Sequence, residues 1–240
     1  MQCLILAGGL GTRMQHLGGD VPKALIPVNG RPFADYQLQW LADQGVRRVV
    51  YAIGYKGDLI RQFVGNGERW GLQIRYADEG EKLLGTAGAI RRAIAAGLMD
   101  DGFFVLYGDS YLCVDLPAVW EASDNGGFPL MTIFRNDGQW DGSNVIAEDG
   151  KIILFEKNRD DARDIGMGYI DYGLSVLTAH VITANVAESE AADLADVFHR
   201  LSLSGELRAF EAQRRFYEIG SPQGLVDLEA RLATGNSDHG

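Results

Sequence analysis

Residues 4–13, LILAGGLGTR, join an apolar run to a glycine-rich loop and a basic residue. The loop carries Gly8, Gly9 and Gly11, and Thr12 and Arg13 follow. Because glycine has no Cβ, the backbone of such a loop can approach a ligand closely, and its successive N–H groups can form an anion-binding concavity. The forked guanidinium of Arg13 suits phosphate oxygens. We interpret the stretch as a buried strand that ends in a phosphate-binding loop.

The spacing of this loop differs from two well-known phosphate-binding patterns. It is neither the G-x-G-x-x-G of dinucleotide-binding folds nor a Walker loop ending in G-K-[ST]. A plain tight turn is the alternative interpretation, and the nearby cations Arg13 and Lys23 count against it. Lys23 stands between Pro22 and the apolar stretch ALIPV, residues 24–28. We therefore expect Lys23 at the rim of packed structure, pointing to a specific partner.

Around this stretch, apolar runs alternate with amphipathic segments through the first half of the chain. We expect strands at 2–6, 48–53, 73–77 and 103–107, and helices at 33–44, 58–64 and 86–96. Alternating strands and helices with continuously apolar strands indicate a parallel sheet that is covered by helices on both faces. The sequence therefore predicts the α/β class.

The second half is richer in strands. We expect strands at 128–134, 144–147, 151–156, 170–177 and 208–216, a helix at 191–201, and a last helix capped by Ser221 and running to about 233. The turn Glu148-Asp149-Gly150 is typical of a hairpin. Because no repeat or linker interrupts the chain, we predict one domain over 1–240. Its nucleotide-binding half covers about 1–115 and its acceptor-binding half about 116–233, and the tail 234–240 is frayed.

Composition narrows the range of partners and locations. The 240 residues include 22 Lys and Arg and 33 Asp and Glu, so the net charge is −11. This charge argues against non-specific binding to nucleic acid or to acidic membranes. Two cysteines, Cys3 and Cys113, cannot build a disulfide framework, and we expect both to be buried free thiols. No apolar run approaches the roughly 20 residues of a membrane span. We expect a cytoplasmic protein.

Five stretches together resemble the sugar-1-phosphate nucleotidyltransferase family: LILAGGLGTR, PKALIPV, NGRPF, LGTAGAI and YGD, in this order. The resemblance covers nearly the whole chain. The short form is similar to bacterial heptose-1-phosphate guanylyltransferases and N-acetylmuramate-1-phosphate uridylyltransferases. The resemblance implies a Rossmann-like, mixed and mostly parallel sheet of the nucleotide-diphospho-sugar transferase type. It also implies a Mg²⁺-dependent cytoplasmic enzyme that joins a nucleoside triphosphate to a phosphorylated sugar and releases pyrophosphate.

The resemblance also assigns roles to particular residues of the first half. Arg13, Lys23 and Asp109, the last residue of YGD, are the expected catalytic residues. Asp109 and Glu218 are the expected Mg²⁺ ligands. The family has Asp at the second ligand position, and this chain has the longer Glu218. The expected nucleotide-binding residues are Leu6, Ala7, Gly8, Gly9, Gly11, Thr12, Arg13, Lys23, Gly85 and Thr86.

The acceptor side departs from the family pattern. Glu156 and Lys157 match the family's Glu-Lys pair, which holds the sugar and its phosphate. Asn144 lies in Ser-Asn-Val where the family has Tyr-Gly-Val, and Asp171 begins Asp-Tyr-Gly where the family has Asn-Ala-Gly. We expect all four residues to bind the acceptor. Asp171, near Trp140 and Tyr172, suits either a cationic group or a sugar hydroxyl.

Two other functions stay open on the sequence alone. A cytidylyltransferase acting on phosphocholine or another small phosphorylated alcohol is favoured by Asp171 and by Ala24, which stands where the family usually has Pro. A catalytically inactive nucleotide-sensing domain is disfavoured by the presence of Arg13, Lys23 and Asp109 together. The sequence does not distinguish GTP, UTP, CTP and dTTP, because the family contacts the base mainly through the backbone near Gly85.

Overall fold

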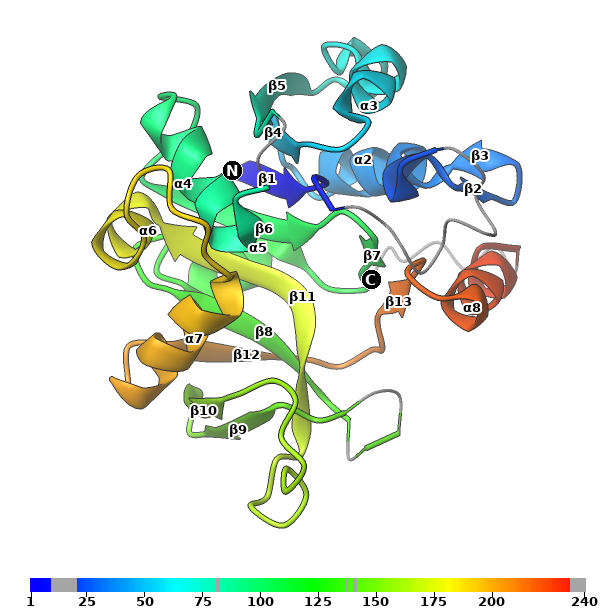
Figure 1. Ribbon diagram of the computed structural model, residues 1–240. Helices are drawn as coiled ribbons and strands as arrows, with labels where there is room; N and C mark the ends of the chain where they lie inside the picture. The colour runs from blue at the N-terminus through cyan, green and yellow to red at the C-terminus, as the bar shows by residue number, and fades with distance from the viewer. Residues whose placement is uncertain (10–20, 81–82, 137, 140–141, 234–240) are drawn as a thin grey trace.

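The computed structural model describes residues 1–9, 21–80, 83–136, 138–139 and 142–233. In this part of the chain, nine strands form one sheet in the order β5-β4-β1-β6-β11-β8-β12-β10-β9 (Figure 1). The bounds are β1 Gln2–Leu6, β4 Arg48–Ile53, β5 Gln73–Asp78, β6 Gly102–Tyr107, β8 Leu130–Arg135, β9 Val145–Glu148, β10 Lys151–Phe155, β11 Tyr169–Thr178 and β12 Arg208–Ala212.

Two kinds of strand pairing divide the sheet. Strands β5, β4, β1 and β6 are paired in parallel, and in this register Leu6 lies beside Ala52 on one side and Tyr107 on the other. Strand β11 then pairs antiparallel with both β6 and β8. Strands β8 and β12 are parallel, and β10 pairs antiparallel with β9 and β12. The predicted α/β class with a mixed sheet is confirmed, but the sheet is not mostly parallel, because its five antiparallel pairings outnumber the four parallel ones in the described part of the chain.

Helices cover both faces of the sheet (Figure 1). One core packs α2, α3 and α5 against side chains such as Cys3 and Ile5, and the other packs α4, α6 and α7 against Leu4 and Val105. Successive residues of β1 face opposite sides of the sheet, and helices bury both sides. For this reason the sequence of β1 is continuously apolar. The bounds are α2 Phe33–Asp43, α3 Gly57–Val64, α4 Gly85–Ala95, α5 Leu116–Ala122, α6 Ala179–Asn185, α7 Leu194–Leu203 and α8 Pro222–Ala233.

Short elements complete the fold. They are the 3-10 helices η2 Lys23–Leu25 and η3 Glu68–Trp70, and the two-residue strands β2 Pro27–Val28, β3 Arg31–Pro32, β7 Ser110–Tyr111 and β13 Tyr217–Glu218. Strand β13 pairs antiparallel with β7. None of the described helices is both long and apolar enough to cross a membrane. Cys3 and Cys113 are buried free thiols, as predicted.

Most element positions agree with the sequence, and the exceptions have local causes. The strand predicted over 208–216 ends at Ala212 in β12. Helix α7 begins later than predicted because the Asp193 side chain caps it, accepting a hydrogen bond from the N–H of Ala195 at 2.9 Å. The sequence analysis missed α5 and α6, which are only seven residues long and are capped by Asp115 and Thr178. The predicted frayed tail, 234–240, lies outside the described residues.

Helix α2 fixes the turn that follows β6. The buried Gln37 side chain, 1% exposed, donates through Nε2 to the carbonyl oxygens of Tyr107 and Ser110, each at 3.0 Å. These two residues flank Gly108 and Asp109. Gly108 in turn donates its N–H to the Leu6 carbonyl at 2.9 Å. The turn carrying Asp109 is therefore held from a helix on one side and from β1 on the other.

Replacing Gln37 by leucine tests this anchor. Gln37→Leu removes both donated hydrogen bonds, and we expect the free energy of unfolding to fall by about 1–2 kcal/mol. The measurement is urea unfolding. The matched control is Gln39→Leu, because Gln39 is exposed on the same helix and donates only to the exposed Asp43. Equal effects of the two substitutions would contradict the anchoring role.

Candidate active site

A pocket of about 270 Å³ opens where β1, β5 and β6 end. All the predicted nucleotide-binding residues that the structure describes line it. They are Leu6, Ala7, Gly8, Gly9, Lys23, Gly85 and Thr86, and the predicted catalytic Asp109 joins them. Carboxyl ends of parallel strands are the usual place for ligands in open α/β sheets. Gly11, Thr12 and Arg13 lie outside the described residues.

An ion pair occupies one part of this pocket. Lys23 Nζ lies 2.9 Å from Asp109 Oδ2, and both side chains are about one-third exposed. The two residues come from η2 and from the turn after β6, which are 86 positions apart. The pair places a mobile ammonium and a carboxylate side by side at an open surface, which is suited to contact with phosphate oxygens.

Glu218 lies next to this pair because β13 pairs with β7. Glu218 is opposite Ser110 in that pairing, and the Ile219 N–H donates to the Asp109 carbonyl at 3.0 Å. A Cβ placed on Gly220 would lie 2.7 Å from Glu218 Oε2, 3.3 Å from Lys23 Nζ and 3.4 Å from Asp109 Oδ2. The three charged groups therefore surround one point. The Glu218 carboxylate accepts from the Gly220 N–H and the Ser221 hydroxyl of its own loop.

The start of α4 forms another wall of the pocket. Gly85 has a φ of +72° and lies so close to the segment before α7 that a Cβ there would be 2.6 Å from the Ala192 carbonyl. The Thr86 hydroxyl donates to Asp193 Oδ1 at 3.0 Å and accepts from the Leu194 N–H at 2.7 Å. Thr86 thus lines the pocket, as predicted, while its hydroxyl joins α4 to α7.

The pocket is also lined by residues that the sequence analysis did not assign to the site, and two of them, Tyr107 and Glu79, are ionisable. Tyr107 ends β6, and Glu79 follows β5 directly. The sequence did contain a positional signal for Glu79. Glu79 directly follows strand β5, just as the predicted loop residues directly follow strand β1. Burial raises the pKa of Glu79, and the Leu84 N–H opposes this shift by donating to Oε2 at 2.8 Å.

Hydrogen bonds connect three of the four predicted acceptor residues, Asn144, Glu156 and Asp171. The Asn144 side chain accepts from the Asp171 N–H at 2.9 Å, and the Asn144 carbonyl accepts from the Glu156 N–H at 3.0 Å. Asp171 Oδ1 accepts from the N–H of Gly173, which has a φ of +92°, at 2.9 Å. A register shift in the pairing of β11 with β8 falls between Asp171 and Ser175. The Asp-Tyr-Gly sequence therefore marks an irregular turn within β11.

Charge also connects this group to the nucleotide pocket. Burial raises the pKa of Asp171, and the Gly173 N–H and the Lys157 ammonium act in the opposite direction. Burial likewise raises the pKa of Tyr107 well above its usual value, and the nearby charge of Asp171 adds to the effect. Lys157 Nζ lies 6.0 Å from the centre of the Tyr107 ring. The predicted acceptor residues Asp171 and Lys157 therefore lie near Tyr107, which lines the pocket described above.

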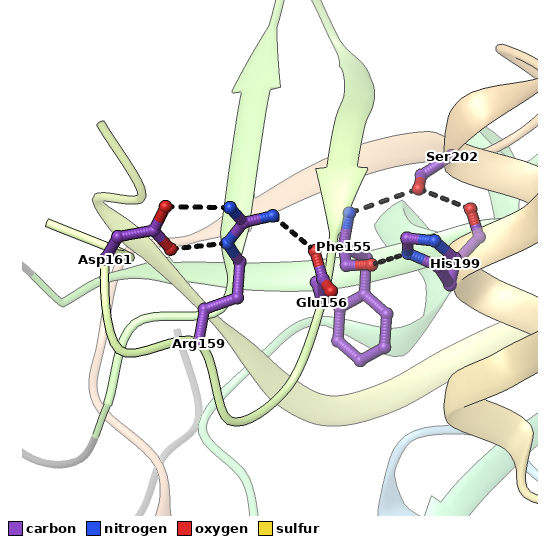
Figure 2. Close-up of polar contacts among 6 residues, drawn as sticks. All are labelled: Phe155, Glu156, Arg159, Asp161, His199 and Ser202. Atoms are coloured by element: carbon purple, nitrogen blue, oxygen red, sulfur yellow. Dashed lines mark hydrogen bonds and ion pairs between the residues drawn. The ribbon is translucent and has the colours of Figure 1, made fainter. Parts of the chain in front are cut away.

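Glu156 is held from two sides (Figure 2). Its carboxylate accepts from Arg159 at 2.7 Å, and Arg159 makes two further contacts with Asp161, at 2.7 and 2.8 Å. The preceding residue, Phe155, is fixed to α7. Its N–H donates to the Ser202 hydroxyl at 3.1 Å, and its carbonyl lies 2.8 Å from His199 Nδ1. Helix α7 thus contacts Thr86 of the pocket through its first residue and Phe155, which precedes Glu156, near its end.

Comparisons with known proteins agree with this geometry. The heptose relative "D-glycero-alpha-D-manno-heptose 1-phosphate guanylyltransferase" of Campylobacter jejuni is 29% identical over 223 residues, which are 93% of this chain and 96% of that protein. The "UTP--glucose-1-phosphate uridylyltransferase" of Synechocystis is 29% identical over 170 residues, 65% of this chain and 44% of that protein.

A solved structure and a family model cover more of the chain. The crystal structure of HddC from Yersinia pseudotuberculosis complexed with GMP-PN matches with a TM-score of 0.77 and 28% identity, covering 96% of this chain and 99% of that one. The model of the nucleotidyl transferase family matches residues 2–234. Motifs, fold and pocket agree with that match, and the chain belongs to the nucleotidyl transferase family.

Proposed function

We propose that this chain transfers a nucleotidyl group from a nucleoside triphosphate to a sugar 1-phosphate and releases pyrophosphate. The observation that carries the proposal is the convergence of Lys23, Asp109 and Glu218 at the glycine-lined pocket. The relatives with heptose 1-phosphate and glucose 1-phosphate in their names support the class of acceptor. We further propose that one domain in the cytoplasm carries out the reaction, as the sequence predicts.

The transfer would proceed by direct displacement. An oxygen of the sugar phosphate attacks the α-phosphorus, the bond from that phosphorus to the β-phosphate oxygen breaks, and pyrophosphate leaves with the electron pair. Such a reaction needs alignment and neutralisation of charge more than covalent help from the protein. Lys23 would lie against the phosphates of both substrates. The Gly8 and Gly9 backbone would hold the triphosphate, and Arg13, named from the sequence, would neutralise the departing pyrophosphate.

Two carboxylates of this chain fit a Mg²⁺ ion. Mg²⁺ takes hard oxygen ligands, and it is commonly held by one or two carboxylates with phosphate and water supplying the remainder. Asp109 and Glu218 provide such oxygens around one point, as the position of Gly220 shows. Among the described residues, no cluster of three or more His, Cys, Asp or Glu side chains offers a complete protein-only metal site. When bound, the ion would offset negative charge on the phosphates.

The residues predicted to bind the acceptor favour a sugar over a cationic alcohol such as choline. Tyr172, the aromatic residue beside Asp171, is buried and packs against Phe134 and Phe216, so it lines no cage for a cation. The positive charge that affects Asp171 comes from Lys157 of the same chain. Trp140 lies outside the described residues. Glu156 and Asp171 would accept hydrogen bonds from hydroxyls, and Lys157 would contact the phosphate.

A pyrophosphate-release screen tests the proposal. GTP, UTP, CTP, ATP and dTTP would each be combined with hexose 1-phosphates, heptose 1-phosphates and phosphocholine in the presence of Mg²⁺. Release with a sugar 1-phosphate is the expected result. Release with phosphocholine alone would favour the cytidylyltransferase alternative. Nucleotide binding without release from any pair would favour the inactive nucleotide-sensing alternative.

The Asp109 carboxylate gives the first kinetic prediction. Asp109→Asn removes one of the two carboxylates and the partner of Lys23, and we expect kcat to fall by at least about 100-fold, the scale of losing one charge-stabilising group. The measurement is steady-state pyrophosphate release with Mg²⁺. Asp100→Asn is the control, because Asp100 pairs with Arg48 on the surface. Near-normal turnover of the Asp109 variant would show that Asp109 takes no part in the reaction.

Replacing Asp171 distinguishes a sugar acceptor from a cationic acceptor. In Asp171→Asn, the amide oxygen can still accept from Gly173 and from a sugar hydroxyl. We therefore expect kcat/KM for the sugar 1-phosphate to fall by less than about tenfold, which is about 1.4 kcal/mol. The affinity for the triphosphate, measured in parallel, should not change. A larger loss confined to the acceptor would instead indicate a buried ion pair with a cationic substrate.

A further inference from the structure

Arg159 is a cation beside the predicted acceptor residues that none of the roles above uses. It lies three residues after Glu156, in the loop that follows β10. Its Nη1 donates to Glu156 Oε2 at 2.7 Å, and its Nε and Nη2 donate to the two oxygens of Asp161 at 2.7 and 2.8 Å (Figure 2). One guanidinium is therefore shared between two carboxylates.

The backbone of this loop supports the arrangement on the Asp161 side. Asn158 has a φ of +60°, a left-handed conformation that asparagine adopts more readily than most residues. Beyond this bend, the carbonyl of Asp161 accepts from the N–H groups of Asp164 at 3.0 Å and Ile165 at 3.2 Å. Asp161 therefore belongs to a hydrogen-bonded turn, which gives Arg159 a fixed partner.

The main chain of Glu156 is held from the opposite side. The Glu156 N–H donates to the Asn144 carbonyl at 3.0 Å. The preceding residue, Phe155, bonds α7 through both backbone groups, its N–H donating to the Ser202 hydroxyl and its carbonyl lying 2.8 Å from His199 Nδ1 (Figure 2). These contacts fix the position of the Glu156 main chain but not the direction of its carboxylate.

The stability of the fold does not account for the contacts of Arg159. The side chains of Arg159, Glu156 and Asp161 are 31%, 38% and 49% exposed. Ion pairs at such positions contribute little to the free energy of folding, because water screens the charges and long side chains lose freedom. The contacts instead set a direction. The planar arginine fork bonds carboxylates in a defined geometry, so Glu156 Oε2 is directed toward it.

This direction leaves the other oxygen of Glu156 for a ligand. An ionised carboxylate can accept several hydrogen bonds through its two oxygens. Oε2 accepts from Arg159, and none of the described residues donates to Oε1. The guanidinium itself is occupied, because Asp161 bonds its other edge. One cation between two carboxylates leaves net negative charge, so the three side chains suit a neutral hydroxyl donor better than an anionic group.

We infer that Arg159 is a positioning residue for the acceptor, which directs the Glu156 carboxylate so that Oε1 accepts from a hydroxyl of the sugar 1-phosphate. The inference rests on the proposed function for the role of Glu156. A freely rotating glutamate would have to be ordered when the acceptor binds, which would weaken binding by up to about tenfold. Arg159 orders it beforehand. Arg159 therefore acts through Glu156 and does not contact the acceptor.

A double-mutant cycle tests this indirect action. The four chains are the wild type, Arg159→Ala, Glu156→Ala and the variant with both changes. Titration calorimetry would measure the affinity for the hexose or heptose 1-phosphate that the wild type binds most tightly, with Mg²⁺ and a saturating non-hydrolysable triphosphate analogue. We expect Arg159→Ala to weaken acceptor binding about five- to tenfold. With Glu156→Ala already present, the same change should alter the affinity by less than about twofold, because nothing remains to be positioned.

Three results would overturn the inference. Equal losses in both backgrounds would show that Arg159 acts independently of Glu156. An unchanged acceptor affinity in Arg159→Ala would show that it positions nothing. A lower affinity for the triphosphate analogue, or a lower midpoint of thermal unfolding, that accounts for the loss of acceptor binding would show that Arg159 supports the fold.

Two further variants complete the design. Arg159→Lys keeps the charge but loses the fork that spans Glu156 and Asp161, so its acceptor affinity should lie between those of the wild type and Arg159→Ala. Arg163→Ala is the matched control and should bind the acceptor as the wild type does, because Arg163 is an exposed arginine of the same loop whose side chain bonds no other described residue.

The same experiment separates the inference from the proposed reaction. The expected cycle, found in a chain that releases no pyrophosphate from natural triphosphates, would disprove the reaction and leave the role of Arg159 intact. Normal pyrophosphate release with equal losses in both backgrounds would disprove only the role of Arg159. A wild-type chain that binds none of the sugar 1-phosphates would overturn both.

Discussion

The site depends on the way β1 is paired in parallel on both edges. Leu6 lies level with Ala52 of β4 and Tyr107 of β6, so neighbouring strands end at the same height. The loops that follow these strands must then pass each other at close range. A Cβ on Gly108 would lie 2.6 Å from the Leu6 carbonyl, and only glycine permits that approach. Residues that follow β1, β5 and β6 consequently line one pocket.

The antiparallel half of the sheet extends this arrangement to the acceptor. Strand β11 pairs with β6, and its irregular turn at Asp171 therefore lies near Tyr107. Helix α7 adds a second connection, because it binds Thr86 through Asp193 and Leu194 and fixes Phe155 through His199 and Ser202. The two halves of the proposed reaction are thus joined by a strand pair and by a helix.

Sequence reasoning succeeded where one local pattern determines one element, and it failed where distant contacts decide. The apolar runs of β1, β4 and β6 and the glycine loop were readable because burial on both faces and close backbone approach each require particular residues. The pairing of Glu218 with Ser110 joins two strands of only two residues each, which leave no periodic signal. Thr86 was assigned to nucleotide binding and lines the pocket, but no local pattern indicates that its hydroxyl bonds Asp193 and Leu194, more than 100 positions away. Glu79 was missed because no motif contains it.

The charged groups of the pocket differ between its two ends, with Lys23 and Asp109 near β6 and Glu79 at the end of β5. In the proposed function, the Gly8–Gly9 backbone and Lys23 would supply the donors and the cation that phosphates need, while the Glu79 carboxylate lines the same pocket at the end of β5. A nucleotide inserted in reverse would bring its phosphates against the buried carboxylate of Glu79. The low local polarity would strengthen the repulsion between these negative charges. The buried charge of Glu79 would therefore disfavour this reversed orientation. In a chain with a net charge of −11, local placement of these few groups, and not the overall field, makes the site receptive to a polyanion.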